Sequence, residues 1–314
     1  MRAYVLRRLG ALVLTLFLIS VIIFLVMRVI PGDPAQIILG TEADPELLAK
    51  LREKLGLNRP LPVQYAGWLK GVVIGDLGDS INYGVPVSSL IASRLAVTGP
   101  LAALALFFTI IIAIPLGIYA ATHHNRLGDY GIMVLSQLGI SIPEFWLGIL
   151  LILLLAVYAR WFPAGGFTDW AESPLGALKS LLLPALALGI VRAAVITRMT
   201  RSSLLEVLGE DYVRTARSKG LAERVVIYKH ALRNSLISVV TVLALQLGGL
   251  LAGTIIIESV FYLPGMGRLV ILAIAQRDLP VVQGIVLLIA AVIILVNFAV
   301  DLLYGLLDPR IRYD

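Results

Sequence analysis

The segment RMTRSSLLEVLGEDYVRTARSKGLAERVVIYKHALRN, residues 198–234, is the longest polar stretch in the C-terminal two-thirds of the chain. It carries eight Lys/Arg and four Asp/Glu residues, and strongly apolar segments flank it on both sides. Its apolar residues recur at helical spacing, with a break at Gly220. This arrangement predicts a structured basic loop between two membrane-spanning helices.

The composition is that of an integral membrane protein. The 314 residues are 59% hydrophobic and 15% charged, with a mean hydropathy of +0.93, whereas soluble domains carry about 25% charged residues. A net charge of +6 would suggest a nucleic-acid partner in a soluble protein, but here the basic residues flank apolar spans and set topology. We therefore expect contact with membrane lipid and none with nucleic acid.

The residue types present also exclude several kinds of site. The chain has no cysteine, which rules out disulfides, thiolate metal sites and cysteine nucleophiles. Only three histidines are present, and two of them are adjacent, His123 and His124. We therefore predict no metal site and no catalytic residues.

Six segments are apolar enough to cross a bilayer, which takes about 20 residues. They are residues 9–27, 95–122, 130–159, 181–197, 235–257 and 279–300. Pro143 and Glu144 interrupt the third segment, and Arg192 lies in the fourth. The first segment is interpreted as a retained helix, because it is too long for a signal peptide and no small-residue cleavage site follows. The prediction is an all-α membrane protein with six transmembrane helices.

The distribution of basic residues orients these spans. The N-terminus, the turn at 122–129, the loop at 198–234 and the C-terminal tail together carry 14 Lys/Arg. The short loops on the other side carry four, and the long 31–94 segment has little weight in the positive-inside rule. The 198–234 loop and both termini are therefore predicted to be cytoplasmic.

Three regions follow from this order. Residues 1–30 form the N-terminal tip and first helix, residues 31–94 an extracytoplasmic cap, and residues 95–314 a five-helix core containing the 198–234 loop. Within the cap, Asp44 before Pro45 predicts a helix start that Gly56 ends, and residues 63–73 predict a second short helix.

The 198–234 loop reads as two helices. Ser203 and Glu206 fit a capping box, predicting a helix from there to Lys219 with Gly220 at its C′ position. A second helix, from about residue 222 to 233, would continue into the fifth span. The result would be an elbow projecting from the membrane.

Two interpretations of this elbow remain open from the residues alone. It could be a solvated loop with a lipid-facing basic surface. Against this, an apolar stripe requires a cover, which favours a docking surface for a cytoplasmic protein. The stripe comprises Leu204, Leu205, Leu208, Tyr212 and Val213.

The loop resembles the EAA loop of permease subunits in binding-protein-dependent ABC importers. GEDYVRTARSKGL at 209–221 and KHALRNS at 229–235 are similar to the dipeptide/oligopeptide/nickel permease family, first-subunit type. Further similar motifs occur in the same order along the whole chain: IPGDP at 30–34, QYAGWLKGVVIGDLGDS at 64–80, SIPEFWLG at 141–148, ESVFYLPGMGRL at 258–269, RDLPVVQG at 277–284 and VDLLYGLLDPRIRY at 300–313.

This resemblance implies a type I ABC importer permease fold and a docking role for the loop. The Glu-Ala-Ala of the general pattern aligns with Arg214, Thr215 and Ala216. Arg214 stands where the pattern has glutamate, so the family's role for that glutamate is not assigned to this chain. The resemblance implies these ATPase-coupling residues: Asp211, Tyr212, Arg214, Thr215, Ala216, Arg217, Lys219, Gly220 and Leu221.

The resemblance also implies partners. They are a second, similar permease subunit, two cytoplasmic ATPase subunits and an extracytoplasmic substrate-binding protein, in a bacterial inner membrane. This chain has no GxxxxGK[ST] phosphate loop. ATP and Mg would therefore be used by the partner subunits, and this chain would bind no cofactor and would not be an enzyme by itself.

Five residues are candidates for the translocation path. Glu144 is acidic within an apparent span, where ionisable groups usually face a cavity or a partner; a helix break near an interface is the alternative. Arg192 could pair with it or lie near the cytoplasmic end. The other candidates are Gln246, Glu258, Pro264 and Gly265, the last two in a predicted turn or re-entrant bend.

These observations predict a permease subunit of an ATP-driven importer for di- or oligopeptides. Nickel, glutathione or small oligosaccharides are alternative substrates, because no motif selects among them. An ion-coupled secondary transporter would favour several intramembrane carboxylates. A membrane-embedded enzyme would need a nucleophile–base or metal-ligand group inside the spans, and the sequence offers none.

Overall fold

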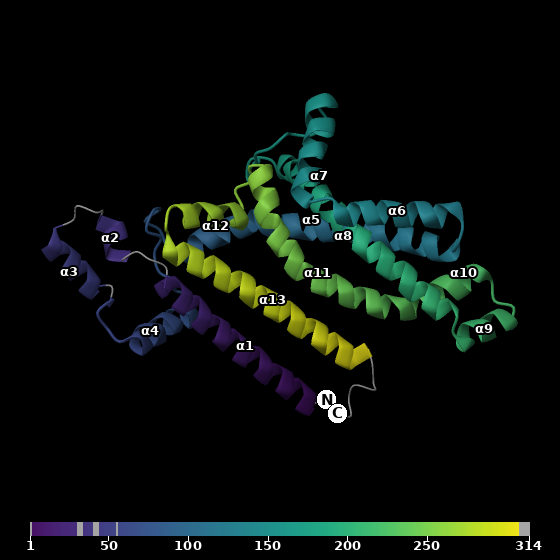
Figure 1. Cartoon of the computed structure of the whole chain (residues 1–314), viewed down its shortest axis with the longest axis horizontal. Helices are drawn as coiled ribbons and strands as arrows, with labels where there is room; N and C mark the ends of the chain where they lie inside the picture. The colour runs from purple at the N-terminus through teal and green to yellow at the C-terminus, as the bar shows by residue number, and fades with distance from the viewer. Residues whose placement is uncertain (1, 30–33, 40–43, 55, 308–314) are drawn as a thin grey trace. The chain divides into compact units, whose positions relative to one another are not determined.

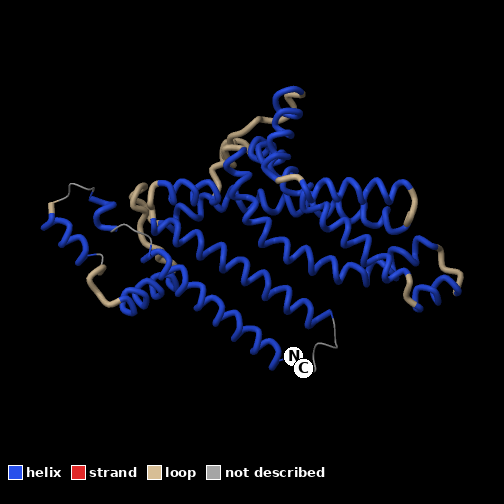
Figure 2. Tube along the Cα trace, viewed as in Figure 1, coloured by secondary structure: helices blue, strands red, loops and turns tan. Residues whose placement is uncertain are grey.

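The structure is a computed structural model that describes residues 2–29, 34–39, 44–54 and 56–307 (Figure 1). Most of the IPGDP motif and the C-terminal DPRIRYD lie outside these residues. Figure 2 shows helices joined by short loops, and the described residues contain no strand beyond an isolated bridge between Asp79 and Pro86. The helices are α1 (Arg2–Val29), α2 (Pro34–Leu39), α3 (Pro45–Lys54), α4 (Leu61–Ile74), α5 (Val87–Thr122), α6 (Leu127–Ser141), α7 (Glu144–Leu151), η1 (Ile152–Tyr158), α8 (Pro174–Leu208), α9 (Asp211–Ser218), α10 (Glu223–Val225), η2 (Val226–Ala231), α11 (Leu232–Val260), α12 (Met266–Ala275) and α13 (Leu279–Leu307).

The predicted all-α fold with six spans is confirmed when one broken helix pair is counted as a span. Five stretches are long and apolar enough to cross a membrane: Val5–Arg28, Val87–Thr122, Pro174–Leu208, Glu223–Val260 and Leu279–Val300. The sixth consists of Leu127–Ser141 and Glu144–Tyr158, which meet at an angle of 103°.

The break in the third span has a local cause. Ile142 adopts an extended conformation, with φ −85° and ψ 125°, as the residue before a proline tends to do. Pro143 then precedes α7, whose first residue is Glu144. The predicted interruption at Pro143–Glu144 is therefore a sharp turn between two helices, larger than a kink.

The predicted capping box at Ser203 and Glu206 is wrong. Helix α8 runs unbroken from Pro174 to Leu208, and Ser203 is a buried residue in its interior. No glycine or proline separates Thr197 from Leu208, so the fourth span continues past the membrane-length segment until Gly209. The first helix of the elbow is α9, which begins at Asp211.

The chain divides into two compact units, residues 1–96 with 268–301, and residues 97–267 with 302–314. In the first unit, α4 packs on α1 through aromatic rings. Tyr65 and Trp68 of α4 lie 5.4 and 5.9 Å from Phe24 between ring centroids. The Tyr65 hydroxyl also forms a 2.7 Å hydrogen bond with Ser20.

The short helices predicted between the first two spans are present. Asp44 accepts a hydrogen bond from the Glu46 backbone N–H at the start of α3, at 3.0 Å. Gly56 has a φ of +66° just beyond its end. Helix α4 spans the predicted 63–73 segment, whereas the six-residue α2 was not predicted.

The second unit is built around α8, which contacts α6, α7 and α11. Leu181, Leu183 and Leu188 of α8 are fully buried and share a core with Leu101 of α5 and Leu250 of α11. Because α8 is enclosed along most of its length, its few polar residues must find partners on neighbouring helices. Those partners define the candidate sites.

Candidate functional site

The elbow between α8 and α11 starts at Glu210, which is extended, with φ −69° and ψ 147°. Its carbonyl accepts the backbone N–H groups of Val213 and Arg214 at 3.0 and 3.2 Å. Asp211 lies in the first turn of α9 and Arg217 in the last, so both charges favour the helix dipole.

Gly220 ends α9 as the sequence predicted for a C′ residue. Its φ is +76°, in the left-handed region, and its N–H donates to the Arg217 carbonyl at 2.9 Å. No atom lies within 4 Å of where a side-chain Cβ would stand. The position therefore requires glycine for its backbone conformation and not for lack of space.

One face of α9 is part of the second unit's core. Val213 and Ala216 are buried in a cluster with Ile118 and Ala121 of α5 and with Leu204 of α8. The predicted need for an external cover over the apolar stripe is therefore wrong for most of the stripe. Leu204 and Val213 are fully buried inside the fold, and Tyr212 is the stripe residue that stays exposed, at 41%.

The opposite face of α9 is exposed and polar. Of the predicted coupling residues, Ala216 faces inward. The exposed ones are Asp211, Tyr212, Arg214, Thr215, Arg217, Lys219, Gly220 and Leu221.

Two contacts close the elbow. Arg217 forms a salt bridge with Glu223 across the Gly220 turn, at 2.7 Å, and this hydrogen bond raises the pKa of Arg217. Asn234, at the start of α11, donates to the Tyr212 hydroxyl at 2.7 Å. The second helix predicted from residue 222 is confirmed, since α10 and the π-helical η2 run directly into α11.

A polar centre lies among α7, α8 and α11. The sequence left open whether Arg192 pairs with Glu144. In the structure Arg192 of α8 forms a salt bridge with Glu144 of α7 at 2.7 Å. Arg192 also donates to the Gly249 carbonyl at 2.7 Å and to the Gln246 side chain at 3.3 Å, both on α11. The two charged side chains are only 16% and 18% exposed.

Two glycines of α11 leave room for this ion pair. A Cβ at Gly249 would collide with the Arg192 guanidinium, and one at Gly253 would collide with the Glu144 carboxylate. The glycines are four residues apart and share one helix face. Small residues here let α11 approach the charged side chains closely, which explains the glycines at positions 249 and 253.

Glu258 and Gly265 form a second buried site near the C-terminal end of α11, with the partly buried Pro264 preceding Gly265. Glu258 has no exposed surface, and its carboxylate accepts a 2.5 Å hydrogen bond from Thr98 of α5. Thr98 in turn accepts the Met266 N–H at 2.9 Å. Gly265 packs directly on the Glu258 carboxylate, so the turn at 264–267 closes over this acid.

Two buried acids were missed by the sequence reasoning. Asp129 lies in α6, is 1% exposed and receives both a 2.5 and a 2.7 Å hydrogen bond from Arg201 of α8. In the first unit, fully buried Asp278 accepts the Ser80 hydroxyl at 2.5 Å and the Asn82 N–H at 3.1 Å. Asp129 stands in the first turn of α6 and Asp278 in a short loop before α13, and their partners are 72 and 198 residues away, so local patterns gave no signal.

The described residues contain no group of three or more His, Cys, Asp or Glu side chains arranged to hold a metal ion.

Comparison with known proteins gives consistent similarities along the chain. Residues 113–313 match the family of binding-protein-dependent transport system inner membrane components, and residues 1–102 match the N-terminal family of such membrane components. The chain is 45% identical over 314 residues to a putative peptide transport system permease protein of Brucella abortus, covering all of both chains. It is 43% identical to the dipeptide transport system permease protein DppB of Escherichia coli, covering all of this chain and 99% of that protein.

A solved structure shares the fold. It is the methionine ABC transporter MetNI in inward-facing conformations, with a TM-score of 0.59 and 18% identity. The similarity covers 70% of this chain and 96% of the matched one.

Proposed function

This chain belongs to the family of binding-protein-dependent transport system inner membrane components, and we propose that it carries di- or oligopeptides as one permease subunit of an ATP-driven importer. The observation that carries the substrate class is the 42–45% identity over the full chain to relatives named as peptide, dipeptide or di/tripeptide permeases. The multi-pass helices agree with an inner membrane location. Its N- and C-termini are proposed to be cytoplasmic.

The elbow is the proposed point of coupling. ABC permeases of this family work with ATPase and substrate-binding partners; here we propose two ATPase subunits, a second permease subunit and an extracytoplasmic binding protein. The exposed residues of α9 and of the turn that follows it, from Asp211 to Leu221, would dock on an ATPase subunit. ATP and Mg would be bound by those subunits.

The packing of α9 supports a lever function. Val213 and Ala216 are buried against α5 and α8, and the Tyr212–Asn234 hydrogen bond ties α9 to α11. A displacement of α9 by an ATPase subunit would therefore be transmitted to three spans at once. Closely packed interiors transmit such displacements because they deform little.

The translocation path is proposed to involve Glu144 and Gln246 at the polar centre, and Glu258, Pro264 and Gly265 at the other end of α11. The Arg192–Glu144 and Arg192–Gln246 contacts and the fully buried, hydrogen-bonded Glu258 support a role in holding the path closed. Ionisable groups inside spans are costly unless they are paired or face a water-filled cavity.

The test is ATPase stimulation in a reconstituted complex of this chain with its second permease and ATPase subunits. Its binding protein would be preloaded with dipeptides, longer peptides, nickel chelates or small oligosaccharides. We expect stimulation and uptake with peptide-loaded binding protein. Stimulation by nickel chelates or sugars alone would overturn the peptide assignment and leave the importer assignment intact.

A further inference from the structure

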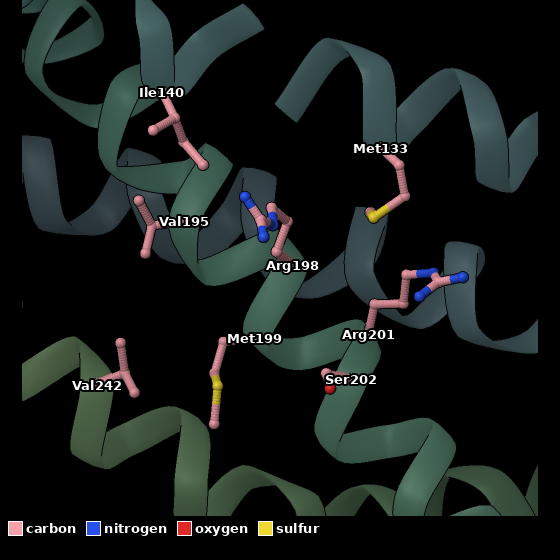
Figure 3. Close-up of a pocket in the computed structure, with 8 residues that line it drawn as sticks. All are labelled: Met133, Ile140, Val195, Arg198, Met199, Arg201, Ser202 and Val242. Atoms are coloured by element: carbon pink, nitrogen blue, oxygen red, sulfur yellow. The ribbon is translucent and has the colours of Figure 1, made fainter. Parts of the chain in front are cut away.

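A groove crosses the second unit over α8, between α6 and α11, with a volume of about 690 Å³. Figure 3 shows the side chains that line it, with α8 running through the middle of the view. They are Met133, Ile140, Val195, Arg198, Met199, Arg201, Ser202 and Val242.

The groove begins next to the polar centre. On α8, Arg192, Val195, Met199 and Ser202 follow one another at spacings of three and four residues, so they share one face. On α11, Val242 lies four residues before Gln246, again on one face. The groove therefore extends from about one turn beyond the Arg192–Glu144 pair toward the elbow.

The groove face is too polar to lie against lipid chains. Arg198 is exposed and donates to the side chain of Gln137, also exposed, at 3.1 Å. Arg198 and Arg192 lie on α8 and Gln246 on α11, both of membrane-spanning length, and Gln137 adds a polar side chain from α6, one half of the broken span. Such groups in spans face a protein interior or a water-filled cavity, so this face belongs to an aqueous path or an interface leading to one.

One positive charge in the groove lacks a counter-charge. Arg192 is paired with Glu144, and Arg201 is paired with Asp129. The hydrogen-bond partner of Arg198 is a neutral amide, and among the described residues no carboxylate forms a salt bridge with it. A guanidinium with free donors binds a carboxylate through two parallel hydrogen bonds.

The remaining walls are apolar and adaptable. Met133 and Met199 come from two different helices, and Ile140, Val195 and Val242 complete the surface. Methionine side chains are flexible and accept differently shaped apolar groups. A ligand that fits this groove would combine one fixed carboxylate with side chains of variable shape.

We propose that Arg198 receives the C-terminal carboxylate of a peptide in transit, while the methionine-lined walls accept its variable side chains. This inference rests on the proposed peptide-importer function and names the residue of this groove that recognises the substrate. A phospholipid phosphate is also an anion, but its acyl chains would require this polar face to meet lipid. We therefore assign the groove to peptide.

The absence of cysteine in the chain allows a direct test in the assembled, reconstituted complex. Met199→Cys would place a single thiol in this chain beside Arg198, with Val242→Cys as a second site. Each is labelled from the cytoplasmic side with an anionic and with a cationic methanethiosulfonate reagent; cysteines of the partner subunits are replaced or labelled separately. The quantity compared is the labelling rate with the anionic reagent divided by the rate with the cationic one. Adding Arg198→Gln should lower this ratio about five-fold, the size of effect that one nearby charge has in water.

The matched controls separate local charge from general effects. Arg198→Lys should keep most of the ratio, and Arg126→Gln, an exposed arginine outside the groove, should leave it unchanged. An unaltered ratio in Arg198→Gln, or no labelling at either thiol, would overturn the proposal.

Peptide protection identifies the occupant. A millimolar dipeptide with a free C-terminus should slow labelling of Met199→Cys at least three-fold more than its C-terminal amide, and Arg198→Gln should abolish the difference. Protection that follows the anionic-lipid content of the vesicles and ignores peptide would instead assign the groove to lipid and overturn the proposal. Peptide uptake by the cysteine-free complex is measured in the same vesicles. If that uptake is absent the proposed function fails, whereas uptake with no Arg198 effect refutes this inference alone.

Discussion

Two ion pairs in the second unit have the same closest N–O distance and different surroundings. Arg192–Glu144 and Arg217–Glu223 both meet at 2.7 Å. The side chains of the first pair are 16% and 18% exposed, and those of the second are 41% and 56% exposed. The first pair joins α7, α8 and α11 in the span region, whereas the second closes a surface turn.

The difference shows that environment, more than distance, decides what an ion pair does. An exposed pair gains little because water and salt screen it. A buried pair is not a large net source of stability either, but losing one partner leaves an uncompensated charge. Arg192–Glu144 therefore makes the arrangement of three spans conditional on both charges being present, while Arg217–Glu223 only restrains the elbow locally.

The sharpest test of this comparison is Glu144→Gln. The substitution preserves shape and removes the charge, leaving Arg192 uncompensated among α7, α8 and α11. We expect a loss of about 3–5 kcal/mol in unfolding free energy, seen as a lower thermal midpoint of the purified protein in detergent, together with loss of uptake.

Two further variants show whether the stability lost in Glu144→Gln comes from the unpaired charge of Arg192. The double variant Glu144→Gln/Arg192→Gln should recover part of the stability, because no buried charge is left unpaired. Glu172→Gln, an exposed acid in a loop, serves as the control and should behave as the parent protein. A single variant as stable as the parent would mean that water reaches the pair freely, contrary to its burial.

Asp129→Asn tests a third pair, in which the acid is fully enclosed and the arginine is partly exposed. Asp129 is 1% exposed but its partner Arg201 is 21% exposed, so water can solvate the arginine once the acid is neutral. We expect a loss of about 1.5–3 kcal/mol in unfolding free energy, the range for hydrogen bonds to charged groups, measured by the same thermal unfolding. Asp79→Asn, at an exposed position, is the control, and equal stability of the two variants would contradict the expectation.

Much of this architecture could be predicted from local sequence patterns. Apolar runs of membrane length located the spans, and Pro143 located the broken one. Gly220 was predicted as a helix-ending residue because a left-handed φ favours glycine, a requirement that acts within one turn of chain. These features depend on residues adjacent in sequence, and the structure agrees with them.

The remaining features depend on contacts between distant segments. Ser203 matched a capping pattern, yet it is buried in α8 because nothing before Gly209 breaks that helix. Asp129 at the start of α6 and Asp278 in a short loop stand in polar segments, where an exposed acid is the ordinary expectation, and only the fold brings Arg201 and Ser80 to them. The inward orientation of Val213 likewise follows from α9 packing against α5, which helical periodicity on its own does not reveal.

Gly220→Val tests whether the elbow turn, closed by the weaker ion pair, controls coupling. A β-branched residue is strained at a φ of +76°, at a cost of about 1–2 kcal/mol, which should shift α9 without unfolding the spans. We expect the assembled complex to hydrolyse ATP without matching uptake, measured as the ratio of the two rates in proteoliposomes. Gly220→Asn is the matched control and should keep coupling, because asparagine tolerates the left-handed region. Normal coupling of ATP hydrolysis to uptake in the Gly220→Val variant would refute the lever function of the elbow.

Glu223→Gln completes the comparison from the exposed side. It removes the same charge as Glu144→Gln from a pair of the same length, but both partners remain in contact with water. We expect a loss of only about 0.2–1 kcal/mol, diminishing further at high salt because exposed charges are screened. Thermal unfolding of both variants at low and high ionic strength measures this directly. A loss of stability as large as that of Glu144→Gln, or one insensitive to salt, would contradict the expectation. Either result would mean that the Arg217–Glu223 contact is shielded from water. The elbow would then owe its stiffness to that contact more than to the buried Val213 and Ala216.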